Sequence, residues 1–181
     1  MSRFISKLGE KALPFYQLLR KSEKFEWTEE AQRAFKHLKS LLSTSPVLVT
    51  PHDKEQLLLY IAATNQVVST VIVVERPEEG HVYNVQRPIY YLSEVLTPSK
   101  QRYPHFQKLA YGVFMIARRL RHYFQVHPIM VVSDAPLENI LNNSDATGRV
   151  SEWGIELSPW DIVYERRKAI KSQVLPDFLA H

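Results

Sequence analysis

Apolar and polar positions in the first part of the chain recur with the spacing of amphipathic helices. Residues 2–21 mix apolar with basic side chains, and we predict two short helices there, broken near Pro14. Thr28 can cap a third helix, because Glu29 and Glu30 follow it and acidic residues favour a first helical turn. The apolar stripe of this helix consists of Ala31, Ala34, Phe35, Leu38, Leu41 and Leu42.

The pattern then changes to short apolar runs that predict strands. Residues 57–63 form a continuous apolar run, residues 67–74 are rich in β-branched side chains, and a third run covers residues 88–93. Short polar segments separate these runs, including a turn at residues 77–80. Three successive strands with short connections predict an antiparallel meander.

Helical and strand patterns alternate after the meander. Pro104 opens a helix expected to reach about Phe124, with an apolar face formed by Phe106, Leu109, Ala110, Val113, Ala117, Leu120 and Phe124. Two further strands are expected at residues 128–133 and 161–165, and three short helices at residues 137–141, 149–157 and 172–179. This order predicts an α/β fold with a mixed five-stranded sheet, in which three antiparallel strands precede two parallel ones. Helices flank the sheet, and a helical extension precedes it.

Composition indicates one compact domain and removes several classes of site. With 181 residues and 45% hydrophobic content, the chain can bury a sizeable core, and it contains no Gly- or Ser-rich linker. The absence of cysteine excludes disulfides and thiolate metal sites, which fits a reducing compartment. No stretch resembles a signal peptide or is long enough to span a bilayer. We therefore expect an intracellular protein, cytoplasmic or nuclear and not secreted, with no membrane partner.

The net charge of +4 and the pI near 9.2 suit a polyanionic partner, but they also suit many ordinary enzymes. Residues 95–133 contain no Asp or Glu, so we expect the positive field of this stretch to be uncompensated. The candidate phosphate-backbone contacts are Lys100, Arg102, Lys108, Arg118, Arg119, Arg121, Arg149, Arg166 and Arg167. For any single one of them, an ordinary solvated helix face is the simpler interpretation.

Five motifs occur in the order found in one known family. They are FEWTEEA (residues 25–31) followed by SPVL (45–48), RPIYYLS (87–93), LRHYF (120–124), SDAPL (133–137), and Gly148-Arg149 with Trp153 and Leu157. In these motifs the chain resembles the RNase H-like domain that follows the polymerase in gypsy-class LTR retrotransposon polyproteins. The amino-acid sequence of residues 60–64 and 173–180 is most similar to that of plant members. The resemblance implies an RNase H-like domain at residues 45–181, preceded at residues 1–44 by a helical polymerase tail or connection segment.

The family cuts the RNA strand of RNA–DNA hybrids with two Mg²⁺ ions held by four carboxylates. Aligned with the family, Asp134 and Asp177 match two of these carboxylates, whereas Ala62 and Leu109 stand at the other two positions. The resemblance therefore implies that an alanine and a leucine face the metal cavity and that efficient hydrolysis is lost. No cofactor is expected, and Mg²⁺ or Mn²⁺ would bind at Asp134 and Asp177 only if residual activity persists.

This conclusion does not depend on the register of the alignment. No acidic residue lies between Glu55 and Glu75 or between Glu94 and Asp134, so neither the first two strands nor the long helix offers a substitute ligand. Asp134 has a second interpretation of equal weight, as a helix cap. Asp177 follows Pro176 and can simply favour the first turn of a terminal helix.

Aromatic residues are more simply interpreted as packing than as base-stacking platforms. The predicted core members are Tyr60, Tyr90, Tyr91, Phe106, Tyr111 and Phe114, with Trp27 and Trp153 as packing anchors.

We predict a catalytically degenerate domain that binds RNA–DNA hybrid and serves as a structural connection within a reverse transcriptase. Its partners would be the hybrid or another nucleic acid, the polymerase and a following RNase H domain of the same polyprotein. A weakly active, metal-dependent ribonuclease H is the second hypothesis. A domesticated interaction module that keeps the fold without hybrid binding is the third.

Overall fold

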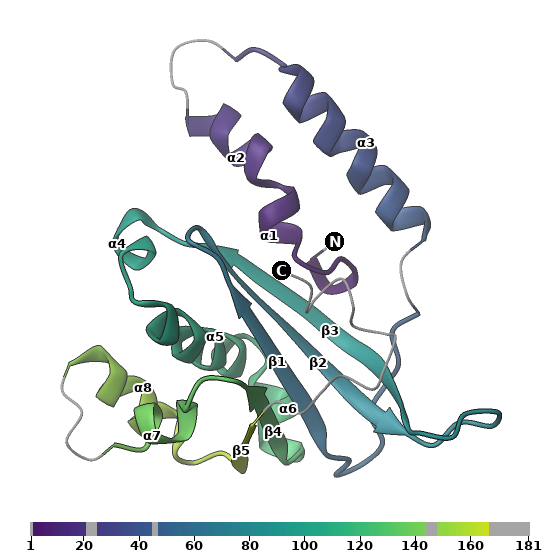
Figure 1. Ribbon diagram of the computed structural model, residues 1–181, viewed down its shortest axis with the longest axis vertical. Coiled ribbons are helices and arrows are strands. Elements are labelled where there is room, and N and C mark those ends of the chain that lie inside the picture. The colour runs from purple at the N-terminus through teal and green to yellow at the C-terminus, as the bar shows by residue number, and fades with distance from the viewer. Residues whose placement is uncertain (1, 21–24, 45–46, 144–147, 167–181) are drawn as a thin grey trace.

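Five strands form one mixed sheet in the spatial order β3-β2-β1-β4-β5 (Figure 1). The computed structural model describes residues 2–20, 25–44, 47–143 and 148–166. The strands are β1 (Leu57–Ala63), β2 (Val67–Arg76), β3 (Val85–Val95), β4 (Ile129–Ser133) and β5 (Ile162–Arg166). β1, β2 and β3 pair antiparallel, whereas β4 runs parallel to both β1 and β5. The predicted meander followed by two parallel strands is confirmed.

Alternation along the strands divides their residues between two hydrophobic clusters, one on each face of the sheet. In β1, Leu57, Leu59 and Ala63 belong to the larger cluster, which includes the buried residues of α5 (His105–Arg119). Tyr60 and Ala62 belong to the smaller cluster on the opposite face. β1 is therefore buried on both sides, as its continuous apolar run predicted.

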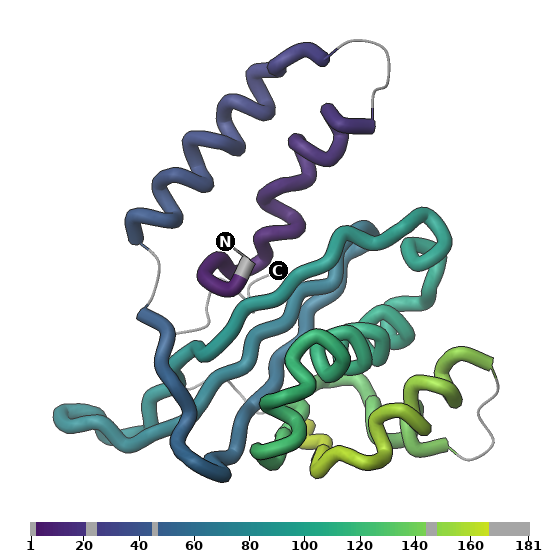
Figure 2. Tube along the Cα trace, turned by 180° about the vertical axis from the view of Figure 1, so that it is seen from behind, coloured from purple at the N-terminus to yellow at the C-terminus, as the bar shows by residue number. Residues whose placement is uncertain are grey.

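The other helices that follow the meander are α4 (Pro98–Gln101), α6 (Arg121–Val126), α7 (Leu137–Leu141) and α8 (Arg149–Leu157). The bounds of α7 and α8 agree with the sequence prediction, and Figure 2 shows α5 to α8 gathered on the same side of the sheet. Gly112 of α5 faces β1 closely, since a Cβ atom there would lie 2.7 Å from Cγ2 of Ile61. The small residue lets the helix approach the strand.

The prediction of one uninterrupted helix from Pro104 to about Phe124 is wrong. The helix breaks at Leu120, whose φ of −119° and ψ of 39° end α5 and precede α6. Leu120 and Phe124 are both buried, so the break keeps both side chains in the core. Phe106 is 47% exposed, which contradicts its predicted place in the core, because it lies in the first turn of α5, where solvent still reaches the helix.

The N-terminal extension begins on the sheet and continues as a projecting pair of helices. Its elements are η1 (Ser2–Phe4), α1 (Leu8–Lys11), α2 (Leu13–Arg20) and α3 (Glu29–Ser43). The Gly9 amide donates a hydrogen bond of 2.7 Å to Ser93 Oγ of β3, and Ile5 is buried. The predicted break precedes Pro14, which lies in the first turn of α2. The predicted cap of α3 is confirmed, because Thr28 Oγ1 accepts from the Ala31 amide at 3.2 Å.

α2 and α3, here called the helical arm, extend away from the sheet (Figure 2). Within the described part of the arm, Ala31 is the one buried residue. The aromatic rings of Phe15, Phe25 and Phe35 lie 5.9, 6.5 and 6.1 Å from the ring of Trp27. Trp27 thus anchors a local aromatic cluster, but the cluster remains partly open to solvent.

Some sequence predictions lie outside what the described residues can address. The terminal helix expected at residues 172–179 is one of them, because the description ends at residue 166. The division at residues 44 and 45 stays a prediction, as does the cellular compartment. None of the helices in the described ranges is both long and apolar enough to cross a membrane.

An ion pair fastens the segment before β1 to the end of β2. The guanidinium of Arg76 donates to both carboxylate oxygens of Glu55, each at 2.7 Å, and to the Thr50 carbonyl at 2.9 Å. The hydrogen bonds from Arg76 lower the pKa of Glu55 from 4.5 to about 2. A depressed carboxylate pKa stabilises the fold above the unfolded value, and this stabilisation is lost as pH falls through the folded value.

We expect Glu55→Gln to lower the free energy of unfolding at pH 7 by about 1 kcal/mol, as for a partly exposed ion pair. The difference from wild type should shrink as pH falls from about 4.5 towards 2, where Glu55 itself becomes protonated. Urea denaturation at a series of pH values measures it. Glu79→Gln removes the same charge from an exposed turn and should show a smaller effect at pH 7. A pH-independent difference would contradict the assignment.

Candidate functional site

The carboxyl ends of the parallel strands β1 and β4 lie side by side. The family resemblance assigns two of the four ligand positions to this edge, at Ala62 and Asp134. Tyr60 and Val132 form the last parallel pair; Ala62 follows two residues later within β1, and Asp134 follows two residues later, just after β4 ends. Ala62 is 6% exposed and belongs to the cluster of Tyr60, Val71, Val73 and Tyr91. Ala62 therefore places a methyl group in an apolar cluster at the carboxyl end of β1, on the strand next to the one that Asp134 follows.

Leu109 of α5 is also buried, but it lies on the other side of the sheet. It is 7% exposed and belongs to the larger cluster, together with Ala63 and Val113. The prediction that Ala62 and Leu109 face one cavity is wrong. Side chains alternate along β1, so Ala63, and not Ala62, shares the face that α5 covers. Ala62 and Leu109 both have hydrocarbon side chains, so neither can bind a metal ion on its side of the sheet.

Asp134 follows β4 and lines a pocket of about 470 Å³. The pocket lining is Val131, Ser133, Asp134, Ala135, Pro136, Leu137, Glu138, Asn139, Tyr164, Glu165 and Arg166. Glu138 and Glu165 thus line the same pocket as Asp134, which the sequence analysis missed. Burial, together with the charge of Glu138, raises the pKa of Tyr164 to about 12, so its hydroxyl stays protonated at neutral pH.

The interpretation of Asp134 as a helix cap is wrong. α7 begins at Leu137 with Pro136 at the N-cap and no side-chain hydrogen bond to cap it. The Ser133 hydroxyl accepts instead from the Ala135 amide at 3.2 Å.

The described residues at this end of the sheet do not fit a pair of Mg²⁺ ions. Hard divalent ions need several converging oxygen ligands. Across residues 2–20, 25–44, 47–143 and 148–166, no three His, Cys, Asp or Glu residues come together in a way that could hold a metal ion. Asp134, Glu138 and Glu165 share a pocket without forming such a group, and Asp177 lies outside the described residues.

Lys108 does not belong to an exposed cationic surface, contrary to prediction. Its side chain is buried, and its ammonium donates to the carbonyl of Asn65 at 3.3 Å. Lys108 lies one turn before Gly112, on the face of α5 that packs against β1 and β2. This lysine therefore contacts the turn between those strands.

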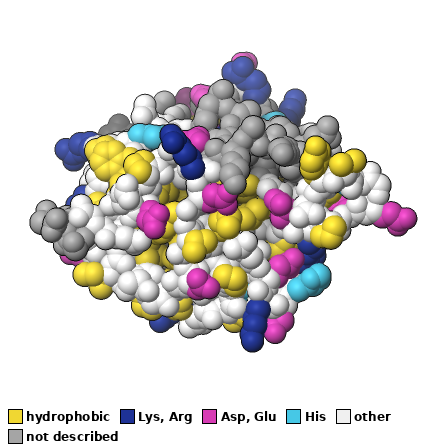
Figure 3. Space-filling model, turned by 60° about the horizontal axis from the view of Figure 1, so that its bottom comes forward, with side chains coloured by type: hydrophobic (Ala, Val, Ile, Leu, Met, Phe, Trp, Pro, Cys, Tyr) yellow, Lys and Arg dark blue, Asp and Glu magenta, His cyan; other side chains and the backbone are white. Residues whose placement is uncertain are grey.

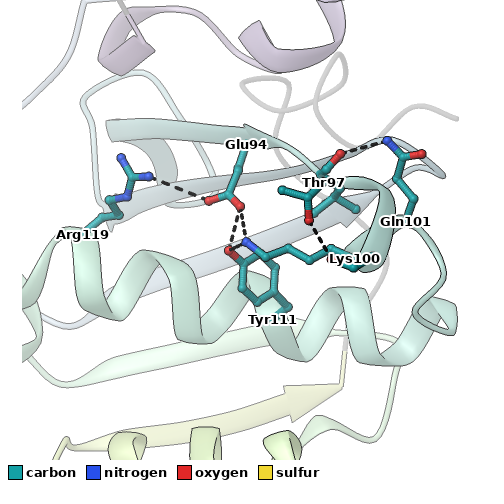
Figure 4. Close-up of polar contacts among 8 residues, drawn as sticks. Glu94, Thr97, Lys100, Gln101, Tyr111 and Arg119 are labelled. Atoms are coloured by element: carbon teal, nitrogen blue, oxygen red, sulfur yellow. Dashed lines mark hydrogen bonds and ion pairs between the residues drawn. The ribbon is translucent and has the colours of Figure 1, made fainter.

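A carboxylate also compensates two of the other predicted cations (Figure 4). Glu94 accepts from Lys100 Nζ and from the Tyr111 hydroxyl, each at 2.7 Å, and lies 3.8 Å from Arg119. Burial raises the pKa of Tyr111. Burial alone would lower the pKa of Lys100, but its bonds to Glu94 and Tyr111 outweigh burial and raise it. The predicted uncompensated field is wrong here, because β3 returns Glu94 to the side of α5.

Three of the arginines predicted to contact phosphate lie over aromatic rings. Arg118 lies 5.3 Å from the ring centre of Phe114, Arg121 lies 5.5 Å from that of Trp160, and Arg149 lies 4.8 Å from that of Tyr103. Glu156 Oε1 lies 3.1 Å from Arg118 Nε, so a second carboxylate compensates the predicted field.

The structure brings two of these arginines into one pocket of about 530 Å³, here called the arginine pocket. Its lining is Phe114, Ala117, Arg118, Arg121, Glu156, Leu157, Pro159 and Trp160. Of the remaining candidates, Arg102 is exposed, Arg166 lines the Asp134 pocket, and Arg167 lies outside the described residues. On the face in Figure 3, Lys and Arg side chains are scattered and Asp and Glu lie among them, so that face carries no continuous basic surface.

The sequence has relatives among retroelement polyproteins. It is 24% identical over 174 residues to the retrovirus-related Pol polyprotein from transposon 297 of Drosophila melanogaster, which covers 95% of this chain and 16% of that protein. It is 29% identical over 130 residues to the Gag-Pol polyprotein of gibbon ape leukemia virus, which covers 72% of this chain and 7% of that protein. The chain therefore spans 16% or less of the length of these relatives.

Solved structures share the fold. A foamy viral protease-reverse transcriptase in complex with RNA/DNA hybrid superposes with a TM-score of 0.73 at 20% identity, covering 93% of this chain and 23% of that one. The foamy viral protease-reverse transcriptase dRH in complex with double-stranded DNA gives a TM-score of 0.73 at 18% identity, covering 93% and 30% of the two chains. The RNase H-like fold is thus confirmed.

The chain also matches the sequence profile described as "RNase H-like domain found in reverse transcriptase" over residues 27–131. This match spans more than half of the 181 residues and includes all of β1 to α6, with the start of β4. The protein therefore belongs to the family of RNase H-like domains found in reverse transcriptases, which occur in retrotransposon and retroviral polyproteins.

Proposed function

We propose that this chain is a catalytically degenerate RNase H-like domain that binds RNA–DNA hybrid and connects other parts of a reverse transcriptase. The observation that carries the proposal is the packing of Ala62 into an apolar cluster at the carboxyl end of β1, on the strand next to the one that Asp134 follows. Converging carboxylates are what hybrid cleavage by this fold requires, and an apolar cluster stands in the place of one of them. Cleavage is therefore the step that this domain has lost.

Hybrid binding is supported by the exposed cations and by the solved neighbours. Arg102 and Arg121 are exposed, and neither forms an ion pair with Asp or Glu among the described residues. Such residues can contact a phosphate backbone and release its counterions. One foamy viral neighbour was solved with an RNA/DNA hybrid.

A connecting role is supported by the helical arm. Phe25, Trp27 and Phe35 are exposed over a wide part of their surfaces and lie in one aromatic cluster. Contiguous exposed apolar surface commonly marks a protein contact. We assign this surface to the polymerase of the same polyprotein and leave hybrid cleavage to a following RNase H domain. The five ordered motifs support a gypsy-class element, and residues 60–64 support a plant type.

We expect the wild-type chain to bind a labelled RNA–DNA hybrid without cutting it in Mg²⁺ or Mn²⁺. Binding should weaken steeply between 50 and 200 mM salt because counterion release drives phosphate contacts, with a loss of about tenfold or more. Fluorescence anisotropy measures binding, and gel electrophoresis of the labelled RNA measures cleavage. Asp134→Asn is the matched control and should cut no less than wild type.

Two outcomes would replace the proposal. Metal-dependent cleavage that Asp134→Asn abolishes would identify a weakly active ribonuclease H with Asp134 as a ligand. Equal, salt-insensitive behaviour towards hybrid and plain DNA duplex would identify an interaction module without hybrid binding.

A further inference from the structure

We propose that the arginine pocket binds one nucleotide unit of a nucleic-acid strand, with its phosphate at Arg121 and its base against Trp160. The pocket lies between the end of α5, the start of α6 and the segment that joins α8 to β5. Residues from these separate elements line it, so its shape depends on the folded domain. The inference rests on the proposed function for the nature of the strand, but the pocket can be tested with a single nucleotide.

The two arginines are held by the rings beside them. Arg121 lies over Trp160 and Arg118 over Phe114, at 5.5 and 5.3 Å from the ring centres. A guanidinium that lies over a ring is attracted to the ring face and loses part of its rotational freedom. A planar, pre-positioned guanidinium matches the oxygens of a phosphate better than a freely moving ammonium does.

The charges around the pocket leave one cation available. Glu156 neutralises part of the field by its 3.1 Å contact with Nε of Arg118. Arg121 lines the same pocket and forms no ion pair with Asp or Glu in the described ranges. Two arginines and one glutamate give the lining a net charge of about +1, so the pocket favours an anion.

The size and the apolar walls point to more than a bare phosphate. Pockets for small ligands commonly measure about 300 to 1,000 Å³, and this pocket measures about 530 Å³. Buried Ala117 and Leu157 form part of its wall, and Pro159 adds another apolar side chain. Trp160 is half-buried and supplies ring surface of the kind on which bases stack in single-stranded nucleic-acid sites.

Adenosine monophosphate and inorganic phosphate are the two probes. When adenosine monophosphate is titrated into the intact chain, the backbone NMR chemical shifts of the residues that line the arginine pocket should change. Phosphate should bind at the same residues more weakly. We expect Arg121→Gln to raise the dissociation constant of the nucleotide about tenfold, as for the loss of one charged hydrogen bond. Arg33→Gln is the matched control, because it removes an exposed arginine charge outside the pocket, and it should leave nucleotide binding unchanged.

A second variant separates stacking from charge. Trp160→Leu should weaken adenosine monophosphate several-fold and leave phosphate binding nearly unchanged, provided that its thermal unfolding midpoint stays near that of wild type. If Trp160→Leu unfolds, Arg121→Gln decides alone, since its side chain is exposed. Absence of nucleotide shifts in wild type, or equal nucleotide binding by Arg121→Gln and Arg33→Gln, would overturn the inference.

The same variants are then titrated with RNA–DNA hybrid. If hybrid binding survives in Arg121→Gln and Arg33→Gln alike and no nucleotide binds at the pocket, the pocket proposal fails and the proposed function is kept. If nucleotide binding depends on Arg121 but the chain does not bind hybrid, the proposed function is contradicted and the pocket proposal is kept.

Discussion

Replacing Leu109 by glutamate is expected to destabilise the domain by about 4 kcal/mol or more, and not to restore catalysis. The substitution would return the carboxylate that the sequence alignment assigns to this helix. However, Leu109 lies in the larger core cluster and is 7% exposed. The change removes apolar contacts and places a charge without a partner in the core. For a chain of this size the unfolding midpoint should fall by about 10 °C.

Leu109→Met is the matched control, because it conserves volume and introduces no charge. It should cost less than about 1.5 kcal/mol. Thermal unfolding followed by circular dichroism measures both variants, and the hybrid cleavage assay is run on each. A Leu109→Glu variant that unfolds like wild type and cuts hybrid with Mg²⁺ would show that this side chain reaches a metal site, and the degenerate assignment would fail.

Elements with strong local patterns were predicted well. The continuous apolar run of β1 and the helices α7 and α8 have the bounds expected from sequence. Their hydrophobic spacing and flanking residues act over a few positions, so neighbouring residues suffice to define them. The break at Leu120 was missed because the apolar stripe continues through it, and only packing decides that α5 ends there.

The candidate site was predicted less well, because sites depend on faces and on residues distant in sequence. The family resemblance assigned Ala62 and Leu109 to two ligand positions but did not place them on opposite faces of the sheet. The alternation along β1 was present in the sequence and could have shown this, since Ala63 shares the parity of Leu57 and Leu59.

The pairing of charges could not be predicted from the spacing of residues along the sequence. The long stretch without acidic residues suggested an open positive field, yet Glu94 bonds Lys100 and lies beside Arg119 after the chain turns back from β3 into α5. Likewise, Trp160 meets Arg121 only through the packing of α8 and β5 beside α5 and α6. A stretch of sequence without acidic residues therefore does not by itself predict a positively charged surface.

Trp153→Ala is expected to destabilise the domain by about 4 kcal/mol. Trp153 of α8 is buried, and its ring lies 6.1, 5.6 and 5.6 Å from the rings of Tyr103, Tyr111 and Phe114. It joins α8 to α5, so its loss opens a cavity between helices that adjoin the arginine pocket. Deletion should also loosen Tyr111, whose hydroxyl donates to Glu94.

Trp27→Ala makes the same deletion at the aromatic cluster of the helical arm, where the ring is 48% exposed. Because less apolar surface returns to water there, this control should cost well under half as much as Trp153→Ala. Urea denaturation of both variants gives the comparison, and Trp153→Phe should recover part of the loss by refilling the cavity. Equal losses at the two tryptophans would mean that the helical arm unfolds together with the sheet. The arm would then be an integral part of the core and not a surface kept for contact with the polymerase.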